Sequence, residues 1–163
     1  YIATLGNFSV FPYQNRGNPL KTHSKKEREL LAFLLDAGDR GATKEQIYEA
    51  LWYDSDSNDV KKLIGVNLSY IKKDLSALGL ENLVVNIEKH YSIRRDEIAT
   101  DADLFEEAAR DFEQNGSRKA AQTILSLYKG EYLSDFEAHW AVAKRLKYAE
   151  IYQKALSAVS SLL

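Results

Sequence analysis

The segment from residue 58 to residue 78 carries the pattern that most constrains the fold. Its apolar side chains recur at steps of four, four, three, four and three residues. At about 100° per residue, this spacing holds them on one narrow stripe of a helix. The stripe must therefore pack into a core, while the opposite side of the helix and its flanks, which carry four lysines, stay in water. The stripe consists of Val60, Ile64, Leu68, Ile71, Leu75 and Leu78.

Two shorter helices are predicted before this segment. Ser24 is a good N-cap residue for the first, and Glu27 stands three residues later as its capping-box partner. Gly38 ends that helix. Thr43 is the N-cap residue of the second helix, which runs to Trp52.

Strands are predicted on both sides of the helices. Residues 2–11 alternate enough to indicate one or two short strands, and residues 12–19 follow as a turn. After the long helix, residues 83–87 and 91–94 indicate a β-hairpin around a tight turn at residues 88–90. A strand, three helices and a hairpin in this order are the arrangement of a winged helix-turn-helix.

Beyond residue 96 the strand signals stop, and three more amphipathic helices are predicted. The first covers residues 103–115 and the third covers residues 135–160. The second begins after its N-cap residue, Ser117, and ends near residue 128. The fold class is therefore mainly α with a small β component, a winged helix-turn-helix followed by an all-α segment. We expect two domains, a winged helix at residues 1–96 and a helical domain at residues 97–163.

The composition narrows the class of protein. Of the 163 residues, 45% are hydrophobic and 28% are charged, as in ordinary soluble globular proteins. The chain has no cysteine, which excludes disulfides, thiolate metal sites and cysteine nucleophiles. It shows no apolar run of about 18 residues and no signal segment, so we expect a cytoplasmic protein without a membrane partner. Methionine is absent even at position 1, so we expect a piece of the parent protein to precede Tyr1.

Charge is distributed unevenly along the chain, whose formal net charge is −2. Residues 58–95 hold seven Lys/Arg against four Asp/Glu, whereas residues 96–163 hold eight against twelve and residues 1–57 hold seven against eight. The segment with the long helix and the hairpin is therefore the only basic one. A nucleic-acid surface has such an excess, but so does an ordinary solvated helix face.

No residue pattern predicts a catalytic or metal site. His139, near Glu137, is interpreted as structural, and His23 and His90 have no partner at ligand spacing. The acidic pair that begins at Asp101 is explained by the dipole of the helix that starts there. Neither a phosphate-binding glycine loop nor a serine nucleophile motif is present. We therefore expect no enzyme activity, no cofactor, no metal and no small-molecule substrate.

The long helix has the two opposed faces that a DNA-recognition helix requires. Its apolar face packs into the core, and its opposite face is free to enter the major groove. Lysines there can neutralise phosphates, while Ser69 and Tyr70 can donate to base edges or to the backbone. The hairpin places Lys89 and His90 at its tip and Arg94 at its base, where they can contact an adjacent backbone. The other contacts predicted from the helix are Lys61, Lys62, Val66, Lys72 and Lys73.

Parts of residues 1–96 resemble the OmpR/PhoB-type DNA-binding domain. The stretches are KERELLAFL at residues 26–34, TKEQI at residues 43–47 with the following LW, and VNLSYIKKDL at residues 66–75. The last stretch is similar to that family's recognition-helix pattern. The resemblance implies that Lys62, Asn67, Tyr70 and Lys72 contact DNA.

Two departures from the family pattern bear on these contacts. Ser69 and Tyr70 stand where the family often has arginines, which implies weaker phosphate anchoring. His90 stands where the family usually has glycine before the tyrosine of the wing, which implies a different wing tip.

The C-terminal part resembles the bacterial transcriptional activator domain of SARP-type regulators. The resemblance is carried by residues 100–106 (TDADLFE) and 127–133 (LYKGEYL), followed by Trp140, Arg145 and Tyr152. The family domain is a tetratricopeptide-like helical array and is normally longer, so this copy is expected to be short or truncated. Repeat helices need neighbours to cover their apolar faces, so a homodimer is one expected consequence.

Together, the residues and the resemblances lead to two hypotheses. The first is a sequence-specific transcriptional regulator that binds double-stranded DNA, as the output region of a larger signal-responsive protein. The resemblance implies an upstream receiver domain of a two-component system and contact with RNA polymerase. The alternative is a protein-interaction scaffold that does not bind DNA.

Overall fold

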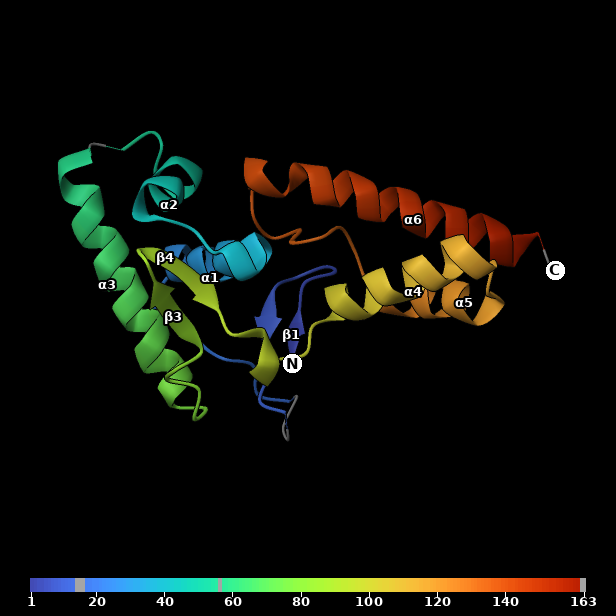
Figure 1. The fold of residues 1–163 in the computed structure, drawn as a ribbon, viewed down its shortest axis with the longest axis horizontal. Coiled ribbons are helices and arrows are strands. Elements are labelled where there is room, and N and C mark those ends of the chain that lie inside the picture. Colours follow the sequence, from blue (N-terminus) through green and yellow to red (C-terminus); the bar gives the residue numbers. More distant parts are fainter. Residues whose placement is uncertain (14–16, 56, 162–163) are drawn as a thin grey trace. The chain divides into compact units, whose positions relative to one another are not determined.

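The computed structural model describes residues 1–13, 17–55 and 57–161, with the backbone alone at residues 57 and 58. Part of the turn predicted at residues 12–19 lies outside the described residues. The described chain forms two compact units (Figure 1). The helical unit comprises Tyr1–Val10, Ala99–Glu137 and Ala141–Leu163, and the winged-helix unit comprises Phe11–Ile98 and Ala138–Trp140.

Three helices and a hairpin build the winged-helix unit, as predicted. The helices are α1 (Lys25–Ala37), α2 (Lys44–Leu51) and α3 (Ser57–Ser76). The hairpin pairs β3 (Val84–Ile87) with β4 (His90–Ile93) in antiparallel fashion. A single bridge between Ala42 and Tyr91 adds the segment before α2 to the free edge of β4.

The N-terminal ends of α1 and α2 are capped by the residues that the sequence indicates. The Ser24 side chain accepts from the Glu27 amide at 3.1 Å. Thr43 forms a complete capping box with Gln46, at 3.2 and 2.9 Å. The capping box predicted for Ser24 is only half formed, because the Glu27 carboxylate accepts the His23 amide at 2.6 Å instead. Glu27 thereby bonds to His23, the residue before the cap, rather than to the cap residue Ser24.

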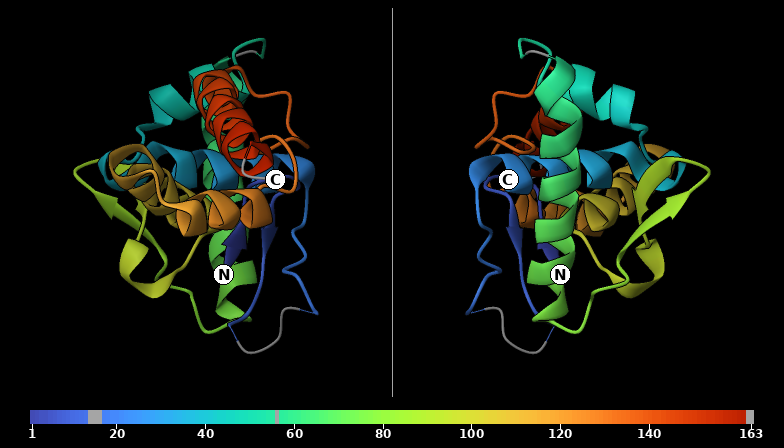
Figure 2. Two further views of the ribbon diagram at one scale, coloured as in Figure 1. Left: turned by 90° about the vertical axis from the view of Figure 1, so that its right-hand side faces the viewer. Right: turned by 90° about the vertical axis from the view of Figure 1, so that its left-hand side faces the viewer.

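The apolar stripe of α3 forms one wall of the core of this unit. Val60, Ile64 and Ile71 are at most 1% exposed, and they belong to the same core as the leucines of α1 and Ile47 of α2. The right-hand view of Figure 2 looks onto α3, drawn in green. The helix ends at Ser76 rather than at residue 78, because the chain turns through Gly79 at φ 72°. A left-handed residue just after a helix is a common way to end it.

Three helices and a small hairpin build the helical unit. The helices are α4 (Asp101–Asn115), α5 (Arg118–Leu127) and α6 (Val142–Ser160), and α5 packs against both others. The hairpin consists of β1 (Ile2–Ala3) and β2 (Ser9–Val10).

An aromatic cluster fills the centre of the helical unit. Tyr148 of α6 is 1% exposed. Its ring lies 5.1 Å from that of Phe105 and 5.2 Å from that of Tyr132. Its hydroxyl donates to Glu106 of α4. These contacts join three segments of the unit through one side chain.

The grouping of β1 and β2 with the helical unit differs from the predicted division at residue 96. The cause is Asp101, which is 4% exposed at the start of α4. Its carboxylate accepts the backbone amides of Thr4 and Leu5, each at 2.8 Å, and the Thr4 hydroxyl at 2.6 Å. A carboxylate that satisfies three donors fixes the N-terminal residues beside α4. In the continuous middle of the chain, the winged-helix unit ends at Ile98 and the helical unit resumes at Ala99.

The last helix begins later than predicted. A helix was expected over residues 135–160, but α6 starts at Val142, after a 3-10 turn at His139–Ala141. The preceding backbone bonds elsewhere: the Leu133 amide donates to the Thr4 carbonyl at 2.7 Å. Arg145 donates to the carbonyls of Tyr132, Leu133 and Phe136 at 2.6–2.7 Å. These long-range bonds outweigh the local helical pattern of residues 135–141.

None of the helices in the described part of the chain is long and apolar enough to cross a lipid bilayer.

Candidate nucleic-acid interface

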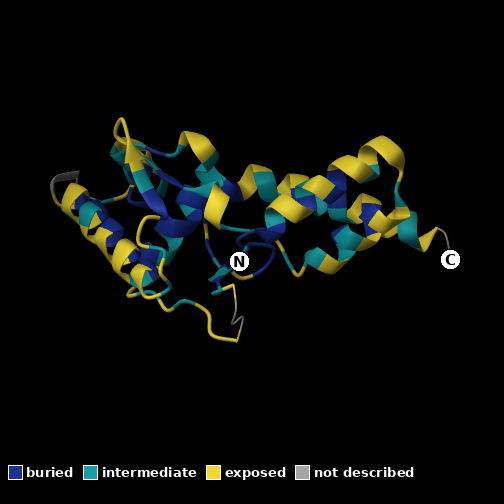
Figure 3. Cartoon of the chain, turned by 60° about the horizontal axis from the view of Figure 1, so that its bottom comes forward, coloured by how far each residue is buried: buried dark blue, intermediate teal, exposed yellow. Residues whose placement is uncertain are grey.

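The sequence folds α3 so that its lysines face water. Lys61, Lys62, Lys72 and Lys73 are all exposed, Lys62 and Lys73 opposite the buried stripe and Lys61 and Lys72 on the flanks (Figure 3 colours exposed positions yellow and buried positions dark blue). Asp74, between the last lysines and the core, is only partly exposed. The exposed side of α3 therefore carries one pair of lysines near each end of the helix.

The outer face also carries apolar and aromatic groups. Leu63 and Val66 are each 44% exposed, and Tyr70 is 37% exposed. Nothing lies within 4 Å of the position where a Cβ of Gly65 would stand, so the middle of the helix is open to a close approach. Apolar side chains at such positions can contact thymine methyl groups in the major groove. Leu63 was missed by the sequence analysis because it lies at the edge of the projected face.

Two of the predicted contact residues are already engaged. Asn67 is 7% exposed, its amide nitrogen donates to the Leu63 carbonyl at 2.8 Å, and its oxygen accepts from Ser24 at 3.5 Å. This burial does not fit the DNA contact expected for Asn67, whose side chain packs toward the start of α1 instead. The Ser69 hydroxyl donates to the Gly65 carbonyl at 3.1 Å, but Ser69 is exposed and its hydroxyl can rotate outward.

A small hollow joins the outer face of α3 to the hairpin. It has a volume of about 200 Å³ and lies between α3, the start of α2 and the β3–β4 hairpin. Two lysines, Lys44 and Lys72, line it together with Ser69 and Tyr91. Lys44 is the first residue of α2, where the helix N-terminus adds a partial positive charge. No sequence pattern singles out Lys44, because only the fold brings it to the same hollow as Lys72.

The hairpin turn is tighter than predicted. Glu88 and Lys89 form a two-residue turn, with φ of 51° and 65°. Two-residue hairpins favour positive φ at both positions. His90 therefore belongs to β4, opposite Ile87, and Lys89 alone of the predicted tip residues lies in the turn itself. Lys89 and His90 are both exposed.

Arg94 is less available than the lysines. Its guanidinium donates to Asp96 at 2.9 Å and lies 3.9 Å from Glu97. The hydrogen bond to Asp96 and the charges of the two acids raise the pKa of Arg94. A phosphate at this position would have to compete with both carboxylates for the guanidinium.

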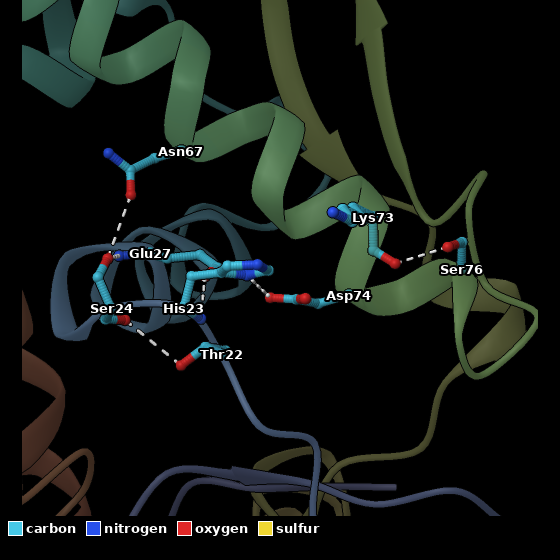
Figure 4. Close-up of polar contacts among 8 residues, drawn as sticks. All are labelled: Thr22, His23, Ser24, Glu27, Asn67, Lys73, Asp74 and Ser76. Carbon is cyan, nitrogen blue, oxygen red and sulfur yellow. Dashed lines mark hydrogen bonds and ion pairs between the residues drawn. The ribbon is translucent and has the colours of Figure 1, made fainter.

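A polar cluster that the sequence analysis missed lies beside this face (Figure 4). The imidazole of His23 stacks on Tyr70, with ring centroids 4.4 Å apart and an interplanar angle of 9°. Its Nδ1 lies 2.9 Å from Asp74, 51 positions later in the chain, and 3.7 Å from Glu27. The expectation that His23 has no partner at ligand spacing is therefore wrong. The fold brings Asp74 of α3 next to His23, and spacing along the sequence cannot reveal such a contact.

The carboxyl groups of this cluster have perturbed acidities. Burial raises the pKa of Glu27 to about 7, and a hydrogen bond with Asp74 adds to this rise. Partial burial opposes ionisation of Asp74, but hydrogen bonds from Glu27 and His23 outweigh it and lower the pKa of Asp74. The two neighbouring carboxyl groups thus differ in acidity, with Glu27 the weaker acid.

A larger hollow of about 800 Å³ lies on another side of the winged-helix unit. It is lined by the end of α1, by α2 and by the hairpin, and His139 stands at its rim. Its acidic residues Asp39, Glu49 and Glu88 outnumber Arg40. This surface is therefore a poor match for phosphates.

Comparisons with known proteins bear on the fold. No family model matches the chain, and no curated protein matches it in sequence. Among solved structures, it is similar to Mycobacterium tuberculosis EmbR, determined in complex with a low-affinity phosphopeptide. The likeness has a TM-score of 0.75 at 16% sequence identity, and it covers 94% of this chain but only 42% of the EmbR chain. The chain thus has the mainly helical fold, with few short strands, of less than half of EmbR.

Proposed function

We propose that this chain is the double-stranded DNA-binding region of a transcriptional regulator. In this proposal α3 enters the major groove and the β3–β4 hairpin lies along the adjacent backbone. The observation that carries it is the division of α3 into a buried apolar face and an exposed face with four lysines. A major groove about 12 Å wide admits one helix presented in this way.

The residues of this face divide into two roles. The lysines Lys61, Lys62, Lys72 and Lys73 would neutralise phosphates, with Lys44, which lines the hollow between α3 and the hairpin, and Lys89 in the hairpin turn. Base contacts would come from Val66, Ser69 and Tyr70, which offer one apolar and two hydroxyl groups. Asn67 is not among them, because it is buried.

The fold supports the same class of function. EmbR is a SARP-family regulator, and its likeness to this chain extends over both units. By analogy, the chain would act in the cytoplasm as the output part of a larger signal-responsive protein, with a two-component receiver as one candidate input. The proposal includes contact with RNA polymerase. It also includes a homodimer that binds an operator made of direct repeats.

Selection from genomic fragments with the purified chain, followed by mobility shifts at two salt concentrations, tests DNA binding. We expect a common site whose log affinity falls with log salt by about 0.9 for each phosphate contact. Replacing both Lys72 and Lys73 with alanine should weaken binding at least tenfold and flatten the salt slope. The reason is that two charge-assisted phosphate contacts are lost while the buried stripe is untouched.

A matched control changes net charge by the same amount elsewhere. Lys119 and Lys147 are exposed lysines on α5 and α6, so the double variant Lys119→Ala with Lys147→Ala should bind like the parent chain. Equal losses in both variants would mean that only overall charge matters. Unchanged binding in the Lys72/Lys73 variant would remove α3 from the interface.

A protein-interaction scaffold is the second candidate, and two observations favour it. Residues 96–163 carry eight basic against twelve acidic residues. Along α6, Val142 is 46% exposed and Leu146 is 68% exposed, as on a surface that docks another protein. A scaffold of this kind should enrich no DNA fragment even at low salt, and it should capture protein partners in a pull-down with the same chain.

A further inference from the structure

Three potential metal ligands from separate parts of the winged-helix unit face one another (Figure 4). His23 precedes α1, Glu27 lies in the first turn of α1, and Asp74 lies near the end of α3. One ligand atom from each of them lies within 4.8 Å of the other two. The imidazole Nδ1 is 2.9 Å from Asp74 Oδ2 and 3.7 Å from Glu27 Oε2.

These separations suit a small ion with four ligands. Bonds of about 2.0–2.2 Å to a tetrahedral ion place neighbouring ligand atoms about 3.3–3.6 Å apart. The separations of Nδ1 from the two carboxylates, 2.9 and 3.7 Å, lie on either side of that range. The ligand atoms of Glu27 and Asp74 lie within 4.8 Å of each other, so an ion would draw the three side chains together from positions that already face one another.

The Glu27 side chain is buried but incompletely bonded. It is 0% exposed, and its Oε2 accepts the His23 amide. Its Oε1 has no hydrogen-bond partner within the described ranges 1–13, 17–55 and 57–161. A buried acceptor without a partner is unfavourable away from water. A cation bound beside Glu27 and Asp74 would give this oxygen a partner.

The cluster is also reachable from solvent and oriented for binding. The His23 side chain is 40% exposed, whereas the side chain of Asp74 is 11% exposed. The stack of Tyr70 on the imidazole holds the ring plane in place. Outer groups that orient a ligating histidine are a regular feature of metal sites.

We propose that His23, Glu27 and Asp74 form a binding site for one Zn²⁺ ion, with His23 Nδ1 and one oxygen of each carboxylate as ligands and water in the remaining position. One nitrogen and two oxygen donors suit Zn²⁺, whereas Mg²⁺ and Ca²⁺ prefer oxygen donors alone. The ion ties the segment before α1 to the end of α3. The site does not depend on DNA binding and would stand if the proposed function failed.

The test uses the whole chain after removal of metal with a chelator. Calorimetric titration with Zn²⁺ should give one site per chain, and Co²⁺ used as a probe should develop the strong visible absorption of a four-coordinate ion. His23→Asn should weaken Zn²⁺ binding more than tenfold and abolish that absorption. Because His23 is exposed, this variant is expected to fold, which far-ultraviolet circular dichroism checks. Asp74→Asn should give the same loss.

His139→Asn is the matched control, because His139 is a histidine with acidic residues near it in sequence but outside the cluster. It should bind Zn²⁺ like the parent chain. Zn²⁺ binding that persists in folded His23→Asn, or that Mg²⁺ matches in affinity, would overturn the site. So would the absence of saturable binding at one ion per chain, since the cluster would then be held by its own hydrogen bonds alone.

Discussion

At the scale of single residues, polar groups with several partners organise this chain more than their local sequence indicates. Asp101 follows a cap residue at the start of a helix, and the helix dipole alone explains an acid there. In the structure its carboxylate also accepts two amides and a hydroxyl from residues 97 and 96 positions earlier. No sequence pattern predicts such a bond, because spacing along the chain carries no information on contacts between distant segments.

Asp101→Asn should lower the free energy of unfolding by about 2–4 kcal/mol. The amide keeps only one acceptor oxygen, and it turns an NH₂ group toward donors of Thr4 and Leu5, so buried donors lose their partners. Urea unfolding followed by circular dichroism measures the loss. Glu113→Gln, an exposed acid on the same helix, should leave the midpoint where it is. A midpoint for Asp101→Asn equal to that of the control would show that the carboxylate does not anchor β1.

At the scale of elements, sequence patterns predicted helices well where the stabilising contacts are local. The stripe of α3 and the caps of α1, α2 and α5 all lie within a few residues of the helices that they define. The start of α6 was predicted about seven residues too early, because Arg145 holds the carbonyls of residues 132, 133 and 136 outside the helix. Among the residues predicted to contact DNA, the four lysines of α3 are exposed in the structure, whereas Asn67 is buried.

The junction between β4 and the segment before α2 depends on one glycine. Gly41 has φ 66°, and a Cβ there would stand 2.3 Å from the Tyr91 carbonyl oxygen. That carbonyl accepts the Ala42 amide at 2.8 Å, so the hairpin cannot move away without losing the bond. Gly79 has a similar φ of 72°, but open space surrounds its Cβ position. Alanine variants at these two positions therefore separate two costs. The Gly41 variant adds a steric clash to the strain of left-handed backbone, and the Gly79 variant has the backbone strain alone.

Gly41→Ala should destabilise the winged-helix unit by more than 2 kcal/mol, whereas Gly79→Ala should cost about 1 kcal/mol from left-handed backbone alone. Hydrogen exchange at the amides of Ala42 and Tyr91 should rise sharply in the first variant and little in the second. Similar exchange in both variants would mean that the hairpin shifts freely to accept the extra methyl group.

At the scale of the whole molecule, the chain has two cores. The aromatic cluster around Tyr148 belongs to the helical unit, and the stripe of α3 belongs to the winged-helix unit. The helical signals of both units were visible in the sequence, but the assignment of residues 1–10 to the helical unit was not, since it rests on Asp101. The proposed DNA face and the proposed zinc site both lie within the winged-helix unit.

Unfolding of the two units should be separable with probes that the sequence itself provides. Both tryptophans, Trp52 and Trp140, belong to the winged-helix unit, so their fluorescence reports that unit, while circular dichroism reports the helices of both. Gly41→Ala should move the fluorescence transition to lower urea concentration. Asp101→Asn should leave the fluorescence transition in place and shift only part of the circular dichroism change. Coincident shifts of both signals in both variants would mean that the two cores unfold as one cooperative unit.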